Sequence, residues 1–192
     1  LWRTAPGLDV RIRRLTRDSV QEARRGDIDL ALAPDLAALP PIAGAVDLSE
    51  FVQRRLYDRR FVLISSARRP RRRLTLEAYA AADHLVVGPD AEGRGFVDDY
   101  LEAHGLRRRV AAAMTDFDAA VQVVARTDLI CVLPEEVVRS SSAKVHVSKP
   151  PLDLPVLPMV LLWLPRDTAD ARHRFVRDQV EQAIRACHGG RP

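Results

Sequence analysis

The sequence has few of the features that mark secreted, membrane-spanning or disulfide-linked proteins. Only two cysteines occur among its 192 residues, so we expect no disulfide framework, and a reducing compartment fits. No apolar run approaches the roughly 18 residues that a transmembrane helix needs, and the first residues do not form a signal peptide. The chain does not begin with methionine, so we expect that its natural N-terminus is missing. These absences predict a cytoplasmic protein without a membrane partner.

Lysine is also scarce, since 28 of the 30 basic residues are arginines. The net charge of +4 would usually suggest nucleic-acid binding. The arginines are scattered, however, and their densest cluster, at residues 68–73, has no aromatic residues between them to stack on bases. A compositional preference for arginine explains the charge equally well. We expect this cluster to be a solvated connection, and we do not expect this chain to recognise a DNA sequence.

Catalytic motifs are missing as well. The five histidines are dispersed without any H-E-x-x-H motif or Cys–His pair at a recognisable spacing, and each is expected at the surface. GPDAEGRG at residues 88–95 has the glycine spacing of a phosphate-binding loop. Arg94 nevertheless stands where the lysine is needed, and Gly95 where the magnesium-binding hydroxyl is needed. We therefore expect a binding protein rather than an enzyme, with no metal and no cofactor.

Strand and helix patterns alternate in the central part of the chain. Residues 85–87, 110–114 and 129–133 predict three strands, and helical spacing at residues 96–104 and from Phe117 onward predicts the helices that join them. Strands joined by single helices form a parallel sheet. Ligands bind such sheets at the carboxyl ends of the strands, which here carry the loop 88–95 and the corner 114–117.

The flanking segments predict further strands and helices. Residues 8–13 alternate apolar and polar, which is typical of a strand, and Thr16 can cap the helix predicted at residues 18–25 before Gly26. Later helices are predicted after Thr75 and from about Thr168 to Cys187. The other predicted strands are residues 28–33, 51–57, 61–65, 144–147 and 159–164.

Four segments, in their order and spacing, resemble the effector-binding domain of LysR-type transcriptional regulators. They are RRGDIDLAL at residues 24–32, LYDRRFVLI at 56–64, the helix and strand of 117–134 that end in DLICVLP, and MVLLWLPR at 159–166. The resemblance covers nearly the whole chain. It implies an α/β, periplasmic-binding-protein-like fold of type 2, with two α/β lobes joined by two crossover segments and a small-molecule cleft at the crossings.

The resemblance also implies how the chain is divided. Lobe I would comprise residues 1–58 and 158–188, and lobe II residues 59–157. We expect a mixed, mostly parallel sheet in each lobe, with the strand at 159–164 beside the strand at 28–33. The first strand and most of the first helix of lobe I are expected to be missing, as is a DNA-binding domain. DNA would be bound only through an absent N-terminal winged helix-turn-helix, and the protein would form homodimers or tetramers.

Candidate ligand-binding residues follow from the resemblance by position. They are Thr16, Pro34, Tyr57, Gly93, Arg94, Gly95, Phe96, Thr115 and Asp116. Structural roles remain open for several of them, because Thr16 and Asp116 can be helix caps, Phe96 can be core and Tyr57 can fill the hinge. Helix N-termini at Thr16 and Asp116 favour an anionic or polar ligand, such as a small carboxylate. A strongly anionic ligand on Asp116 would need a compensating arginine such as Arg94.

Three functions compete on these observations. The main hypothesis is the ligand-sensing domain of a LysR-type transcriptional regulator, which binds a small-molecule effector. The alternative is a periplasmic-type solute-binding receptor for transport, which predicts a secretory signal or a lipid-anchor cysteine upstream. An enzyme on the same scaffold would need a catalytic constellation that the sequence does not display. Residues upstream of Leu1 would discriminate, since a winged helix favours the regulator and a signal peptide the receptor.

Overall fold

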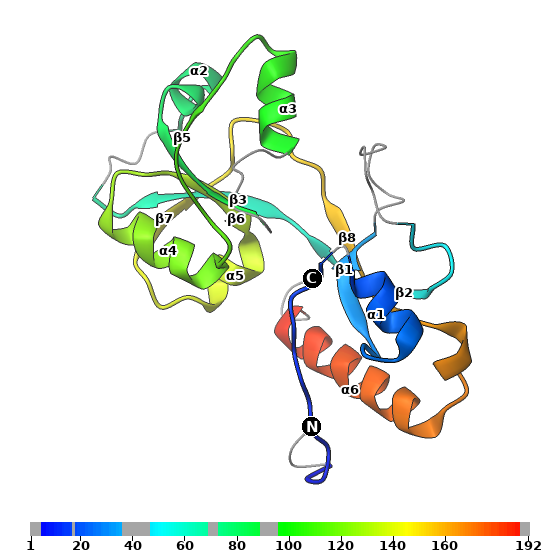
Figure 1. Ribbon diagram of the computed structural model, residues 1–192. Helices are drawn as coiled ribbons and strands as arrows, with labels where there is room; N and C mark the ends of the chain where they lie inside the picture. The colour runs from blue at the N-terminus through cyan, green and yellow to red at the C-terminus, as the bar shows by residue number, and fades with distance from the viewer. Residues whose placement is uncertain (1–4, 17, 36–46, 69–72, 89–95, 189–192) are drawn as a thin grey trace. The chain divides into compact units, whose positions relative to one another are not determined.

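The computed structural model describes residues 5–16, 18–35, 47–68, 73–88 and 96–188, and the chain forms two compact units (Figure 1). Unit 1 contains Leu1–Asp58 and Leu157–Pro192, and unit 2 contains Arg59–Val156. Each unit combines strands with helices. Among the helices of these described ranges, none has both the length and the hydrophobicity that a membrane span requires.

Unit 1 is built on a three-stranded sheet in the order β1-β8-β2. These strands are β1 (Ala31–Pro34), β8 (Leu157–Trp163) and β2 (Val52–Arg59). The C-terminal strand β8 therefore lies beside β1, as we expected. The two strands run antiparallel, from the pair of Ala31 with Leu162 to the pair of Pro34 with Met159. The expectation of a mostly parallel sheet is wrong for this pair, because no single-helix crossover connects these two strands.

Among its described residues, unit 1 also contains two α-helices. The first is α1 (Ser19–Arg25), and the second is α6 (Ala171–His188), which follows the short 3-10 helix η2 (Pro165–Asp167). α1 ends as predicted at Gly26, whose φ of 86° is left-handed and whose N–H donates to the carbonyl of Ala23 at 3.0 Å. A glycine adopts this conformation without the steric cost that a Cβ brings.

Replacing Gly26 by alanine should destabilise the protein by about 1 kcal/mol, because a Cβ is strained in the left-handed region. The space itself is open, since the nearest atom to an added Cβ is Arg166 Nη2 at 3.9 Å. Thermal unfolding of the variant measures this cost of backbone strain. Gly7→Ala is the matched control, because Gly7 has no positive φ and no atom within 4 Å of the added Cβ. Equal melting temperatures for the two variants would contradict the left-handed conformation of Gly26.

The alternating segment at residues 8–13 does not form the predicted strand. Ile12 is 90% exposed, and Val10 is exposed as well. A period-two pattern becomes a strand only where a neighbouring strand takes its backbone hydrogen bonds. Within the part of the chain that the structure describes, no strand pairs with these residues.

Unit 2 contains the predicted helix-linked strands. β4 (Asp83–Val87) and β5 (Arg109–Met114) run parallel, and α3 (Phe96–Ala103) connects them. A parallel bridge between His84 and Ile130 brings the segment before β6 (Cys131–Pro134) to the other side of β4. The strands joined by single helices are therefore parallel, as the sequence predicted.

The strand β3 (Phe61–Ser66) departs from this parallel winding. It pairs antiparallel with β6 on one side and with β7 (Val145–Ser148) on the other. β6 and β7 consequently run parallel to each other across β3, and α5 (Glu135–Ser140) joins them. The crossover rule applies only to strands joined by one helix, and β3 is not joined to either neighbour in this way.

Helices cover both faces of the unit 2 strands (Figure 1). Ile64 packs with α4 (Phe117–Arg126), where Ala120, Val121 and Val124 are fully buried. The adjacent Leu63 points to the opposite face and packs with residues of α2 (Leu76–Ala80) and α3. This alternation follows from the pleat of a strand. Phe117 is 38% exposed, because it is the first residue of α4 and precedes the buried turns.

Candidate ligand-binding site

The carboxyl ends of β4 and β5 bring two of the predicted ligand segments to one edge of the sheet. Val87 is paired with Met114, and the N–H of Gly88 donates to the carbonyl of Met114 at 3.0 Å. The loop that begins at Gly88 and the corner with Thr115 and Asp116 thus start side by side. Backbone N–H groups at such an edge are the usual ligand-binding groups of parallel sheets.

Thr115 and Asp116 are both exposed at this edge. Asp116 Oδ1 accepts a hydrogen bond from the N–H of Ala119 at 2.7 Å, so Asp116 is the N-cap of α4 as predicted. This carboxylate satisfies one of the free donors at the helix start and adds negative charge there. An anionic ligand that approaches α4 must therefore overcome the charge of Asp116.

The loop residues of the predicted site can be placed only in part. Gly93, Arg94 and Gly95 lie outside the described residues, and Phe96 is the first residue of α3. Compensation of Asp116 by Arg94 therefore stays a prediction.

A buried ion pair ties the first turn of α3 to the start of β5. Arg108 donates from Nε to Asp98 Oδ1 at 2.8 Å and from Nη2 to Asp98 Oδ2 at 2.7 Å. The Arg108 side chain is only 4% exposed and that of Asp98 16%. Such a bidentate pair fixes orientation as well as distance. It anchors α3, the helix that follows the predicted ligand loop. A pair ten residues apart leaves no periodic signal in the sequence, so sequence reasoning missed it.

Next to this pair, His84 and Tyr79 are fully buried. His84 Nε2 lies 2.8 Å from the carbonyl oxygen of Tyr79, and the two rings meet edge to face at 4.6 Å. Burial lowers the pKa of His84 to about 4 and raises the pKa of Tyr79 to about 12. The expectation that every histidine lies at the surface is wrong for His84, because β4 carries it into the core. Burial also raises the pKa of the Cys131 thiol to about 12, which disfavours the reactive thiolate.

Thr16 does not cap α1 in the way the sequence predicted. The N-cap residue is Asp18, and it makes no side-chain cap hydrogen bond. The Thr16 N–H donates to Ser19 Oγ at 2.9 Å, and the two hydroxyl oxygens lie 3.4 Å apart. The capping prediction is wrong because the helix begins at Ser19, so the N-cap position is Asp18, and Thr16 lies two residues before it. Thr16 itself is exposed.

Pro34 and Tyr57 both lie on strands of unit 1. Pro34 ends β1 opposite Met159, and the N–H of the next residue, Asp35, donates to the carbonyl of Pro158 at 2.7 Å. Tyr57 is half-buried and stacks on the ring of His188, with 3.8 Å between centroids. Sequence reasoning missed His188, because its contact joins two segments far apart in the chain and has no local pattern.

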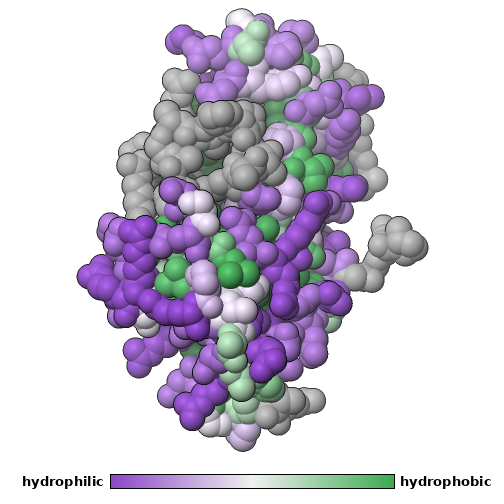
Figure 2. All heavy atoms as spheres, turned by 90° about the vertical axis from the view of Figure 1, so that its right-hand side faces the viewer, coloured by the Kyte–Doolittle hydropathy of each residue, from purple (hydrophilic) through white to green (hydrophobic). Residues whose placement is uncertain are grey.

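The described ranges contain no group of histidine, cysteine or acidic side chains able to hold a metal ion. In the coloured part of the face that Figure 2 shows, hydrophilic residues predominate and hydrophobic residues form small separate areas. The candidate residues that can be placed offer hydroxyls, a carboxylate and an aromatic ring. These groups suit reversible binding of a polar small molecule.

Comparison with known proteins shows what the chain is similar to. The family model of the LysR substrate binding domain matches residues 2–185. The chain is 28% identical over 189 residues to Nodulation protein D 3 of Rhizobium leguminosarum bv. phaseoli, which covers 96% of the chain and 60% of that protein. It is 27% identical over 194 residues to HTH-type transcriptional regulator SyrM 1 of Sinorhizobium fredii, covering 97% of the chain and 53% of the relative. The chain thus spans about half the length of the curated relatives it matches.

Solved structures agree with this relationship. A probable transcriptional regulator of Pseudomonas aeruginosa superposes with a TM-score of 0.76 at 27% identity, covering 93% of this chain and 58% of that one. The BenM effector binding domain with its effector benzoate gives a TM-score of 0.66 at 14% identity, covering 100% and 85%. The fold is therefore of the predicted periplasmic-binding-protein-like type. Because the family model matches residues 2–185, the chain belongs to the LysR substrate binding domain family.

Proposed function

We propose that this chain is the ligand-sensing domain of a LysR-type transcriptional regulator and that it binds a small-molecule effector in the cleft between its two lobes. The observation that carries the proposal is the family match over residues 2–185. The chain spans 53% of a relative named as an HTH-type transcriptional regulator, which leaves room in such a protein for a separate DNA-binding part. In this proposal unit 1 corresponds to lobe I and unit 2 to lobe II, the full-length protein acts in the cytoplasm as a homo-oligomer, and the chain is not an enzyme.

The ligand class that we propose is a small carboxylate. Thr16 offers an exposed hydroxyl on lobe I, while Thr115 and the N-terminus of α4 offer polar groups on lobe II. Helix N-termini favour negative charge, and Arg94 from the loop would offset the charge of Asp116. Among the solved relatives, the BenM domain holds benzoate, which makes benzoate a reasonable first probe.

The effector would act by favouring one arrangement of the lobes. A molecule that contacts Thr16 on one lobe and the loop before α3 on the other binds both only when the lobes approach each other. Such a ligand shifts the population toward the closed arrangement by the difference in its affinity for the two states. Because it prefers the folded, closed protein, it should also raise thermal stability.

Replacing Thr16 by alanine should weaken benzoate binding by roughly 0.5 to 1.5 kcal/mol, or up to about tenfold, because one ligand hydrogen bond is lost. Isothermal titration calorimetry of parent and variant measures the difference. Since the Thr16 hydroxyl does not cap α1, the variant without ligand should melt at nearly the parent temperature.

Thr127→Ala is the matched control, because Thr127 is an exposed threonine at the far end of α4, with its hydroxyl bonded to Val123 O at 3.0 Å. Its affinity for benzoate should equal that of the parent. Equal affinities of the parent and Thr16→Ala would remove Thr16 from the site. If neither benzoate nor other small carboxylates bind the parent, the proposed ligand class is wrong.

A further inference from the structure

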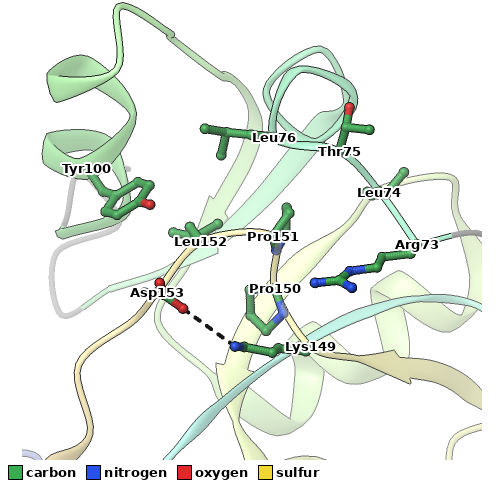
Figure 3. A pocket seen from close by; sticks show the side chains of 10 residues that line it. All are labelled: Arg73, Leu74, Thr75, Leu76, Tyr100, Lys149, Pro150, Pro151, Leu152 and Asp153. Atoms are coloured by element: carbon green, nitrogen blue, oxygen red, sulfur yellow. Dashed lines mark hydrogen bonds and ion pairs between the residues drawn. The ribbon is translucent and has the colours of Figure 1, made fainter.

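A groove of about 400 Å³ opens on unit 2 between the residues that lead into α2, the helix α3 and the proline-rich segment after β7 (Figure 3). Its floor is apolar and consists of Leu74, Leu76, Leu152, Pro150 and Pro151. Leu152 is 4% exposed and packs in the same core cluster as α2 and α3. The floor is therefore fixed by the core of the unit, and its volume lies in the range of small-molecule sites, about 300 to 1,000 Å³.

Two cations stand at the rim of this groove. The guanidinium of Arg73 points toward Pro150 (Figure 3), and among the described residues Arg73 makes no hydrogen bond or ion pair. Lys149 Nζ lies 3.5 Å from Asp153 Oδ1, and these side chains are 75% and 92% exposed. An exposed ion pair of this kind contributes little and exchanges readily. The rim therefore carries positive charge that a carboxylate ligand can take up.

The opposite wall of the groove is aromatic. Tyr100 projects from α3 toward Leu152 (Figure 3), and its ring is held in place by stacking on His104, with 4.4 Å between centroids. Aromatic rings favour other rings in stacked or edge-to-face contact. Apolar floor, aromatic wall and cationic rim together match a molecule with a ring at one end and one negative charge at the other.

We propose that unit 2 carries a second ligand site in this groove, which binds a small aromatic carboxylate. The ring would lie on the apolar floor against Tyr100, and the carboxylate would lie between Arg73 and Lys149. None of the nine candidate residues of the inter-lobe site lines this groove. The site is contained within one unit, so this inference does not depend on the proposed function.

Phenylacetate is a suitable probe, and uncharged phenylacetamide is its matched control. Titration into the ¹³C- and ¹⁵N-labelled chain, followed by NMR, should shift the Tyr100 ring and Leu152 methyl signals in a saturable way. We expect a dissociation constant on the order of 1 mM for a ligand of this size in an open groove. Phenylacetamide should bind roughly fivefold more weakly or worse, because one exposed charge interaction is lost.

Two substitutions at the rim should act in opposite directions. Arg73→Gln should weaken phenylacetate binding roughly fivefold, whereas Asp153→Asn should strengthen it, because the carboxylate that competes for Lys149 is removed. Thr16→Ala should leave the shifts at Tyr100 and Leu152 unchanged, which separates this site from the inter-lobe site. The proposal is overturned if no saturable shift occurs at these residues up to about 10 mM, if the amide binds as well as the acid, or if Arg73→Gln leaves the affinity unchanged.

Discussion

Replacing Asp98 by alanine is expected to destabilise unit 2 by about 3 to 5 kcal/mol, because it leaves a buried charge without its partner. Arg108 is only 4% exposed, and its Nε and Nη2 both donate to the Asp98 carboxylate. Its guanidinium would have to remain buried unpaired or force the first turn of α3 open to water. Urea-induced unfolding measures the loss of stability, and hydrogen exchange at the amides of unit 2 shows where in the chain it occurs.

Glu102→Ala is the control for this prediction. Glu102 lies on the same helix and pairs with Arg107 at 3.4 Å, but these two side chains are 53% and 87% exposed, so the stability should change little. The double variant Asp98→Ala, Arg108→Met should recover much of the loss, because an apolar side chain of similar length suits the buried site. Similar stabilities for Asp98→Ala and Glu102→Ala would show that the buried pair does not anchor α3.

Acidification is expected to cost the domain stability through His84. Its pKa is about 4 when folded, against 6.5 for an unburied histidine. As the pH falls below about 6.5, the unfolded chain therefore takes up this proton before the folded chain does, and the difference stabilises the unfolded state. Stability is fully present above that pH and is lost at up to about 1.4 kcal/mol per pH unit toward pH 4, or about 3 kcal/mol in total.

The free energy of unfolding is measured from about pH 7 to pH 4 for the parent and for His84→Gln. The two proteins are compared by the pH dependence of this free energy, because its absolute value does not report on the His84 proton. Between about pH 6.5 and pH 4, the stability of the variant should fall less steeply than that of the parent, even if the variant is less stable at every pH. His104→Gln removes an exposed histidine from the same unit and should leave the loss in place. If stability depends on pH equally steeply in the parent and in His84→Gln, His84 is not the cause of the acid-induced loss. The carboxylates Asp83 and Asp98, whose charges act on His84, are present in both proteins, so their own titration cancels in this comparison.

Features that depend on a few neighbouring residues could be predicted from the sequence. Thr75 Oγ1 accepts from the Ala78 N–H at 3.2 Å, and Asp116 accepts from Ala119 in the same way, as their positions before helical patterns indicated. Gly26 and Gly105 both have the positive φ expected at helix ends. In each case a residue and its partner lie within one turn, so local chemistry decides the outcome.

Features that depend on distant partners could not be predicted. α6 was expected from Thr168, but Thr168 Oγ1 accepts from Trp163 Nε1 at 3.0 Å, and the helix begins at Ala171 after Asp170 accepts from the His173 N–H. The neutral, buried state of His84 likewise depends on the core around it. In the site, the pairing of β4 and β5 confirmed that the two lobe II segments begin together, whereas ligand contacts of Thr16 and Tyr57 remain predictions.

The discontinuity of unit 1 has a consequence for how the protein forms on the ribosome. β1 is completed by β8, which is synthesised only after all of Arg59–Val156. Unit 2, by contrast, is contiguous and can fold as soon as it has emerged, because domains generally fold as units during synthesis. Until β8 appears, β1 exposes the edge that β8 will cover, and unpaired strand edges invite aggregation. Early release of the nascent chain before residue 157 would therefore yield a folded unit 2 attached to an unfinished, aggregation-prone unit 1.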